Sequence, residues 1–284
     1  MISDLISELN SEFSVFKEGG DEIKRGKYGT CIESYKISTA RQEKIFGKER
    51  GKYTLLFFRD FLENDRTLKY YQNAFKCALK GYLPEVGTDD VILVVGLGNR
   101  HISADSLGAE VVKNLVVTRE MSKTLPKVCA CAPSVLGLTG IETADTVEAI
   151  VGKIKPNIVI FVDALCASHA SRLGKSFQIS DTVITPGDGV GNARKKALLK
   201  GVRVISIGVP FVVYSSTFVE CALADVGIDQ KSVDDQKLKA KIKKLTETNR
   251  SELVTLKDIE GAVKRAGRLI GRAINSTLLG FEQL

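Results

Sequence analysis

The spacing of hydrophobic residues changes near residue 90 of this 284-residue chain. Residues 1 to about 88 contain an acidic, amphipathic opening, the alternating stretch YGTCIESYKIS and the apolar stretch YTLLFF, which predict short strands. One helix is predicted there, over FLENDRTLKYYQNAFKCALKGYL, because the pattern ends at Gly81 and Pro84. The first third of the chain is therefore expected to be mostly strand.

From Val91 onward, buried strands alternate with helices. Strands are predicted over VILVV (91–95), VCACA (128–132), IVIFV (158–162) and VRVISIGVP (202–210), and helices over 105–117, 142–154 and 191–201. Leu256, Ile259, Val263, Ala266, Ile270 and Ile274 lie three or four apart and predict a closing helix that packs on the core. Such alternation predicts an α/β fold with a mostly parallel twisted sheet, helices on both faces and extra N-terminal strands.

Composition narrows the class of protein. No run of about 18 apolar residues occurs, and the opening MISDLISELNSEF is acidic, so neither a membrane span nor a secretory signal is expected. The six scattered cysteines predict reduced thiols in a cytoplasmic setting, and two histidines are too few for a zinc site built mainly from imidazole. The net charge of +7 is compatible with nucleic-acid binding, with acidic partners or with solubility alone. The basic stretch Lys231–Arg272 is interpreted as a solvated helical surface, because it lacks the aromatic residues that stack on bases.

Two acidic residues follow the predicted central strands. Asp105 comes after VILVV in GLGNRHISADSLGAE, and Asp163 directly follows IVIFV. Because ligands of open parallel sheets bind beyond the carboxyl ends of the strands, both are candidates for chemistry. The structural alternatives are a helix-terminus carboxylate for Asp105 and a buried acid that bonds turn amides for Asp163. If the two carboxyl groups share a cleft, one keeps its proton and the other accepts one from water.

Glycine-rich loops flank these acids. Gly96, Gly98 and Asn99 form GLGN, which lacks the third glycine of a dinucleotide fingerprint, so its backbone amides are candidate donors to a substrate carbonyl. Gly187 and Gly189 lie in ISDTVITPGDGVGNARKKA, either a substrate-facing loop, an anion site or a structural loop, and Asp181 in that stretch is a third candidate acid. No GxSxG serine motif and no cysteine–histidine motif competes with the acids.

Several long segments, in this order, resemble the germination proteases of spore-forming bacteria. They are VVGLGNRHISADSLGAEVVKNLVVTR, APSVLGLTGIETAD, KPNIVIFVDALCA, QISDTVITPGDGVGNARK and ISIGVPFVV, which together run from about Val94 to Val213. SDLISE near the start is similar to the family's acidic N-terminal element.

The resemblance implies an endopeptidase that degrades small acid-soluble, DNA-protecting spore proteins during germination. It implies aspartic-type catalysis by Asp105 and Asp163 without a metal or other cofactor, a fold similar to that of hydrogenase-maturation proteases, a homotetramer, and a location in the spore core. It also implies a zymogen, with residues 1–15 as propeptide and 16–284 as one α/β peptidase domain. Neither nucleic acid nor a membrane is an expected partner.

The chain departs from the family pattern at several places. It is shorter between about Ala224 and Leu253, has Phe211 and Tyr214 in and after VPFVV, and has Cys166, Ser168 and His169 after the DAL motif. Two alternatives therefore stay open. One is a metal-assisted maturation protease that uses the same acids, and the other is a non-catalytic relative that only binds spore proteins.

Overall fold

A computed structural model describes residues 3–13, 22–183, 197, 199, 201–225 and 252–280 of the chain. The strands are β1 (Glu22–Arg25), β2 (Thr30–Ile37), β3 (Gly51–Phe58), β4 (Val91–Gly96), β5 (Lys127–Cys131), β6 (Ile158–Ala167), β7 (Ser176–Ser180), β8 (Arg203–Tyr214) and β9 (Leu253–Thr255). The helices are α1 (Ile6–Phe13), α2 (Ala40–Phe46), α3 (Leu68–Lys80), α4 (Leu107–Lys113), α5 (Leu136–Thr139), α6 (Thr143–Ile154), α7 (Ser215–Asp225) and α9 (Ile259–Leu279), with short 3-10 helices η1 (Asp65–Thr67), η2 (Ser103–Asp105) and η3 (Ala170–Arg172).

The described strands form one sheet in the order β1-β2-β3-β7-β8-β6-β4-β5, with β9 beside β8. Strands β8, β6, β4 and β5 pair in parallel, whereas β1, β2, β3 and β7 are antiparallel and meet the parallel half at β8. The α/β class and the extra N-terminal strands are confirmed. Parallel pairing is confined to one half of a mixed sheet.

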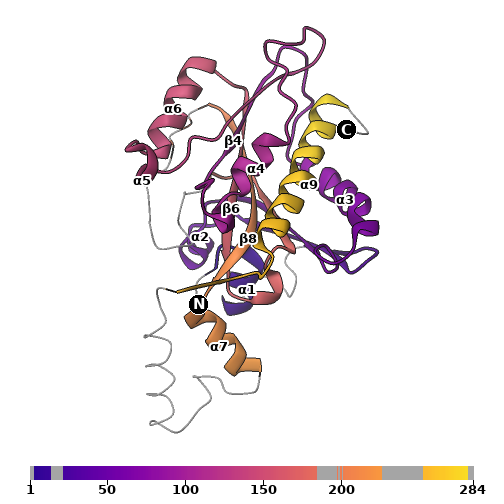
Figure 1. Cartoon of the computed structure of the whole chain (residues 1–284), viewed down its shortest axis with the longest axis vertical. Helices are drawn as coiled ribbons and strands as arrows, with labels where there is room; N and C mark the ends of the chain where they lie inside the picture. Colours follow the sequence, from indigo (N-terminus) through magenta and orange to yellow (C-terminus); the bar gives the residue numbers. More distant parts are fainter. Residues whose placement is uncertain are drawn as a thin grey trace.

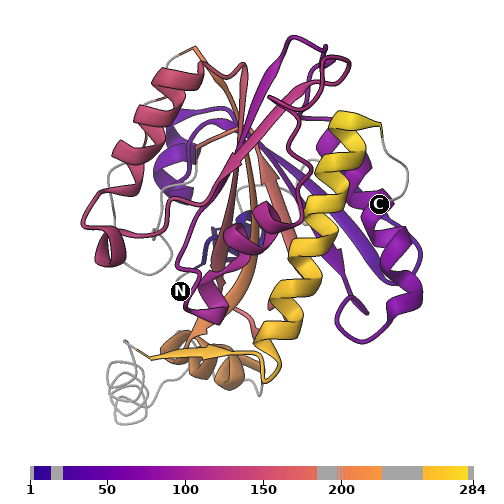
Figure 2. The same cartoon turned by 45° about the horizontal axis from the view of Figure 1, so that its top comes forward.

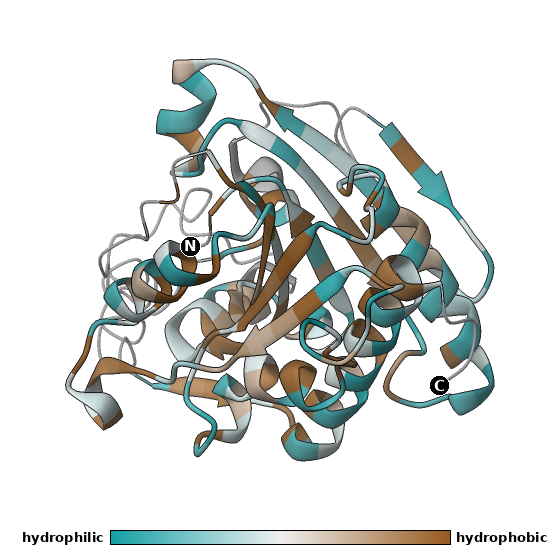
Figure 3. Ribbon diagram, turned by 90° about the horizontal axis from the view of Figure 1, so that it is seen from above, coloured by the Kyte–Doolittle hydropathy of each residue, from teal (hydrophilic) through white to brown (hydrophobic). Residues whose placement is uncertain are grey.

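Helices cover both faces of the sheet, as predicted (Figures 1 and 2). Helices α3, α4 and α9 enclose the main core with the inward side chains of the central strands, and α6 packs on the opposite face of β4 and β6. On that second face, α1 and α2 cover β2 and β3 through a smaller cluster. The central strands are the most hydrophobic part of the ribbon (Figure 3), since both of their faces are covered.

Several elements differ from the sequence prediction. Helices α1 and α2 lie in the N-terminal third, where only one helix was predicted, so that region is not mostly strand. Helix α4 ends at Lys113 instead of residue 117, because Asn275 of α9 binds the Val116 N–H at 2.9 Å and the Asn114 carbonyl oxygen at 3.0 Å. Strand β7 has the sequence SFQIS and was not predicted, because its alternation of polar and apolar residues extends over only five positions. It is nevertheless buried throughout, between β3 and β8. The helix predicted over 191–201 lies largely outside the described residues.

No helix among the described segments is long and apolar enough to cross a membrane.

Candidate active site

Asp105 lies in the connection between β4 and α4. After the buried strand β4 the chain turns at Gly98, whose φ is +95°, and continues into η2, which ends at Asp105. A Cβ atom at Gly98 would lie 2.1 Å from the Asp105 carbonyl oxygen, so only glycine leaves room there. The Asn99 N–H donates to Asp105 Oδ2 at 2.7 Å. The loop predicted to offer free amides to a substrate thus uses the Asn99 amide to hold the carboxylate.

Gly96 has a packing role in the same turn. A Cβ atom on Gly96 would meet the Gly108 carbonyl oxygen at 2.2 Å, and one on Gly108 would meet the Leu97 nitrogen at 2.4 Å. The first turn of α4 therefore rests directly on the end of β4. This contact fixes the position of η2, and with it Asp105, relative to the sheet.

Asp163 lies inside β6, not after it. The sequence predicted that this strand ends at Val162, but pairing with β8 continues to Ala167, and Asp163 is in register with Gly208. The longer strand includes the less regular stretch ALCA, which pairs with β8 through an irregularity after Leu165. The Asp163 side chain is buried, with 6% of the residue exposed, and its Oδ1 accepts the Ala164 N–H at 2.9 Å.

The two carboxyl groups interact electrostatically. Burial raises the pKa of Asp163 well above its usual value, the charges of Asp105 and Asp4 raise it further, and the hydrogen bond from Ala164 lowers it less. The folded chain therefore favours the uncharged form of Asp163 more than the unfolded chain does. The strand order explains why Asp105 and Asp163 interact, because β4 and β6 are adjacent parallel strands and η2, which contains Asp105, follows β4. The sequence-predicted pair is thus brought together.

The N-terminal segment binds beside this pair, which the sequence did not predict. The Asp4 N–H donates to the Cys166 carbonyl oxygen at 2.9 Å, and Asp4 Oδ2 accepts the Cys166 N–H at 2.9 Å. Glu8, buried at the start of α1, accepts the N–H groups of Ser168 and His169 at 2.8 and 3.0 Å. The only sequence signal was the acidic character of this segment.

Further contacts anchor the same segment to the sheet. Gln178 of β7 accepts the Ile6 N–H at 2.9 Å and donates to the Asp4 carbonyl oxygen at 3.2 Å. Lys48 forms an ion pair with Asp4 at 3.5 Å. Leu5 and Ile6 are fully buried. The segment is therefore an integrated part of the fold, seated on the carboxyl end of β6.

The other predicted site residues lie elsewhere. Asp181 follows β7 and accepts the Lys52 N–H at 2.7 Å at the start of β3, so it stabilises a strand junction and does not join the pair. Gly187 and Gly189 lie outside the described residues. Phe211, a departure from the family pattern, is fully buried in the main core.

One further side-chain contact lies just beyond the end of β6. Cys221 Sγ lies 3.8 Å from His169 Nε2, a contact that sequence spacing did not indicate because the residues are 52 positions apart. Within the described parts of the chain, no three His, Cys, Asp or Glu side chains converge as a metal would require.

Comparison with solved structures finds a NiFe hydrogenase maturation protease from Thermococcus kodakarensis. It is 17% identical and covers 70% of this chain and 99% of its own, with a TM-score of 0.37. The α/β assignment rests on the strand order described above and not on this distant likeness.

Sequence comparison is more specific. Residues 17–269 match the family model of the germination proteases, peptidase family A25. A germination protease of Caldanaerobacter subterraneus is 34% identical and covers 97% of this chain and 93% of its own. The germination protease of Clostridium tetani is 32% identical, and the match covers 95% of this chain and 92% of the relative. The germination protease of Bacillus velezensis is 34% identical, and the match covers 86% of this chain and 70% of the relative. The chain therefore belongs to the germination protease family.

Proposed function

We propose that this protease hydrolyses small acid-soluble spore proteins with Asp105 and Asp163 as its catalytic pair. The observation that carries the proposal is the buried Asp163, whose pKa is raised by burial and by the charge of Asp105. Two carboxyl groups that share one proton can act as acid and base in the same reaction. Family membership supports a protease of germination.

In this proposal the two acids have different tasks, which the surroundings of each support. Asp105 is partly accessible and is held by the Asn99 N–H, so it is the acid that takes a proton from water as the water oxygen bonds to the peptide carbonyl carbon. Asp163, whose uncharged form burial favours, gives its proton to the amide nitrogen as the carbon–nitrogen bond breaks. A net transfer of one proton from Asp105 to Asp163 restores the starting state.

The N-terminal segment supports a zymogen. Residues 3–9 occupy the carboxyl end of β6, and Asp4 is close enough to Asp163 to raise its pKa. We propose that removal of residues 1–15 uncovers the pair for a substrate. Residues 1, 2, 14 and 15 lie outside the described residues.

The central test is cleavage of a purified small acid-soluble spore protein, followed by mass analysis of substrate and enzyme. Asp105→Asn and Asp163→Asn should each lower kcat by about 10²- to 10⁴-fold, because each removes one proton-transfer group. Asp89→Asn is the matched control, since Asp89 is exposed and pairs only with Lys127 among the described side chains. Full activity in both active-site variants, with intact folding by circular dichroism, contradicts the proposal.

Assembly and location are proposed from the family resemblance alone. We expect a homotetramer that is located in the spore core. Light scattering of the processed and the unprocessed chain measures the number of subunits. A monomer in both forms contradicts the tetramer without affecting the catalytic proposal.

A further inference from the structure

Helices α3 and α9 lie side by side on one face of the sheet (Figures 1 and 2). Both helices bury their apolar sides in the main core, so their other sides point away from the sheet. Six basic side chains lie on this outward surface, which we call the basic face. They are Lys69, Lys76 and Lys80 of α3, and Lys264, Arg268 and Arg272 of α9. All are exposed except Lys76, which is partly exposed.

No acid within the two helices balances most of this charge. Helix α3 has three lysines and neither Asp nor Glu, and the only acid of α9 is Glu260 in its first turn. Glu260 lies 3.7 Å from Lys264. The other five cations form no ion pair within 4.0 Å with any acid that the structure describes. The basic face therefore carries a net positive charge.

The cations are arranged in two rows. Residues 264, 268 and 272 are four apart, so their Cα atoms follow one side of α9 at intervals of about 6 Å along its axis. Helices α3 and α9 begin at the same end of the pair, since Arg265 of α9 forms an ion pair with Asp65 just before α3. The axes of packed helices lie about 8–10 Å apart. The two rows thus run beside each other over at least about 12 Å.

The basic face presents no large apolar side chain to a partner. Among the described residues, none of the exposed large hydrophobic side chains lies on α3 or α9. A helix that binds a membrane surface exposes apolar residues to the acyl boundary, and a stable protein interface buries aromatic or other large anchors. The lack of exposed aromatic rings also disfavours stacking on unpaired bases. A partner of this face is therefore recognised by a regular array of negative charge.

Double-stranded nucleic acid has that chemistry. A DNA duplex carries one phosphate charge about every 1.7 Å of its axis, so about seven phosphates lie along the length of the α9 row. Contacts from lysine and arginine to phosphates require no aromatic residue and carry no sequence information. The missing aromatic residues thus exclude base stacking but leave phosphate binding open.

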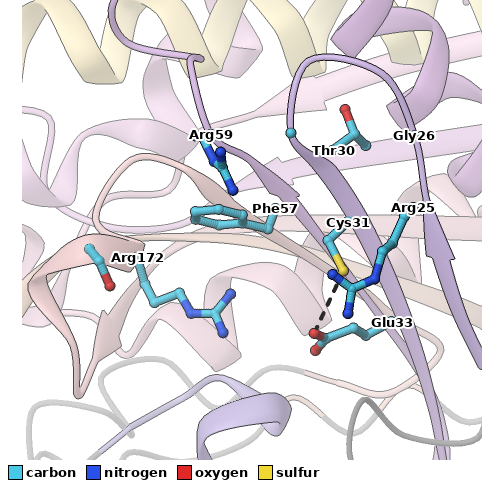
Figure 4. Close-up of a pocket in the computed structure, with 10 residues that line it drawn as sticks. Arg25, Gly26, Thr30, Cys31, Glu33, Phe57, Arg59 and Arg172 are labelled. Atoms are coloured by element: carbon cyan, nitrogen blue, oxygen red, sulfur yellow. Dashed lines mark hydrogen bonds between the residues drawn. The ribbon is translucent and has the colours of Figure 1, made fainter.

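Another group of cations in the described structure does not belong to this face. They line a pocket of about 520 Å³, whose residues include Arg25, Arg59, Arg172, Glu33 and Phe57 (Figure 4). Phe58 packs with α3 and α9 in the main core, so its neighbour Phe57 in β3 points to the opposite side of the sheet. The pocket is concave and contains a carboxylate, and neither property suits the side of a duplex.

We propose that the basic face of α3 and α9 binds the phosphate backbone of duplex nucleic acid without regard to its sequence. This function is separate from the Asp105–Asp163 pair and does not depend on the proposed peptidase activity. It differs from the expectation, drawn from the family resemblance, that nucleic acid is not a partner. Binding of this kind has a Kd of about 10⁻⁴ to 10⁻⁶ M near physiological salt.

The test is fluorescence anisotropy of a labelled 20-base-pair DNA duplex, titrated with the full chain at 50 and 200 mM NaCl. The affinity of the wild type should fall roughly 10³-fold between these concentrations, because six phosphate contacts release about five counterions. Two duplexes of unrelated sequence should bind equally within about threefold, since phosphate contacts do not read bases.

The variant Lys264→Gln/Arg268→Gln/Arg272→Gln removes the α9 row. It should bind at least about tenfold more weakly at 50 mM NaCl, and its affinity should fall only about 40-fold between the two salt concentrations, because three contacts remain. Lys69→Gln/Lys80→Gln removes most of the α3 row and should reduce the salt dependence by about two counterions. This second variant keeps the test valid if the first one folds poorly by circular dichroism.

Arg41→Gln/Lys44→Gln/Lys153→Gln is the matched control. It loses the same three charges from exposed positions of α2 and α6, which cover the opposite face of the sheet. Its affinity should stay within about twofold of the wild type at 50 mM NaCl. An equal loss of affinity in the control and the α9 variant shows that net charge alone attracts the duplex, and overturns the proposal.

The same titration distinguishes other classes of partner. Absence of salt-dependent duplex binding by the wild type overturns the proposal. Binding of vesicles that contain phosphatidylserine, or of polyglutamate, without binding of the duplex assigns the face to a membrane or to an acidic protein and also overturns it. Duplex binding that is weakened by both basic-face variants and not by the control supports it.

Discussion

The raised pKa of Asp163 makes the stability of the folded chain depend on pH in an identifiable direction. In the unfolded chain Asp163 titrates near 3.8, whereas burial and the charge of Asp105 raise its pKa in the folded chain. Its contribution is fully present below 3.8, and is lost as pH rises toward the folded pKa, because folding then requires the uptake of a proton. The loss is at most about 1.4 kcal/mol per pH unit.

Asp163→Asn removes the loss of stability that Asp163 causes as pH rises, because asparagine does not titrate. The difference in Tm between this variant and the wild type should be near its minimum at about pH 4 and should grow in favour of the variant as pH rises. Scanning calorimetry from pH 4 to 8 measures it, with Asp89→Asn as a variant whose difference stays flat. A difference that shrinks with rising pH shows that Asp163 is ionised in the folded chain.

Gly98 offers a second test of the site. Gly98→Ala places a Cβ at a φ of +95° and against the Asp105 carbonyl oxygen, so it should cost about 1–3 kcal/mol of stability and displace the carboxylate. Gly152→Ala is the contrast, because Gly152 is exposed in α6 with open space around it, and should gain about 1 kcal/mol. Urea unfolding and peptide cleavage report the two effects. Equal stability changes in both variants contradict this account of the turn.

Helix α1 and the residues before it are held mainly by two acids and a few apolar side chains. Glu8→Ala leaves the N–H groups of Ser168 and His169 without their acceptor, at roughly 1–3 kcal/mol for each buried group. Hydrogen exchange in residues 3–13 should become at least about tenfold faster, and N-terminal processing should accelerate. Glu22→Ala, at an exposed site on β1, should leave both unchanged. Unaltered exchange in the Glu8 variant means that apolar packing alone holds the segment.

Strand β8 joins the two halves of the sheet. It pairs in parallel with β6 on one side and antiparallel with β7 on the other, so hydrogen bonds run from β1 to β5 without a break. The halves should therefore unfold as one cooperative unit. Urea transitions followed by far-ultraviolet circular dichroism and by tyrosine fluorescence should coincide. Two separated midpoints contradict this expectation and indicate independent halves.

The sequence predicted the elements whose hydrophobic pattern is local. Apolar runs predicted strand β4 and the first part of β6, and helical spacing predicted α6 and α9. In these elements the buried positions are hydrophobic at the period of the strand or helix, so the pattern can be read from the sequence. Strand β7 was missed, since its burial depends on β3 and β8 and not on its own residues. The family followed from motifs in a fixed order, which the comparisons confirm.

Which groups surround each acid was decided only by tertiary structure. The sequence placed Asp105 and Asp163 after two strands, but the parallel pairing of those strands brings their charges together. The sequence showed that the N-terminus is acidic. It did not predict that Asp4 and Glu8 bind the end of β6, more than 150 residues away. Local patterns record whether a residue is buried, whereas electrostatic coupling and hydrogen bonding depend on distances between segments that only the folded chain sets.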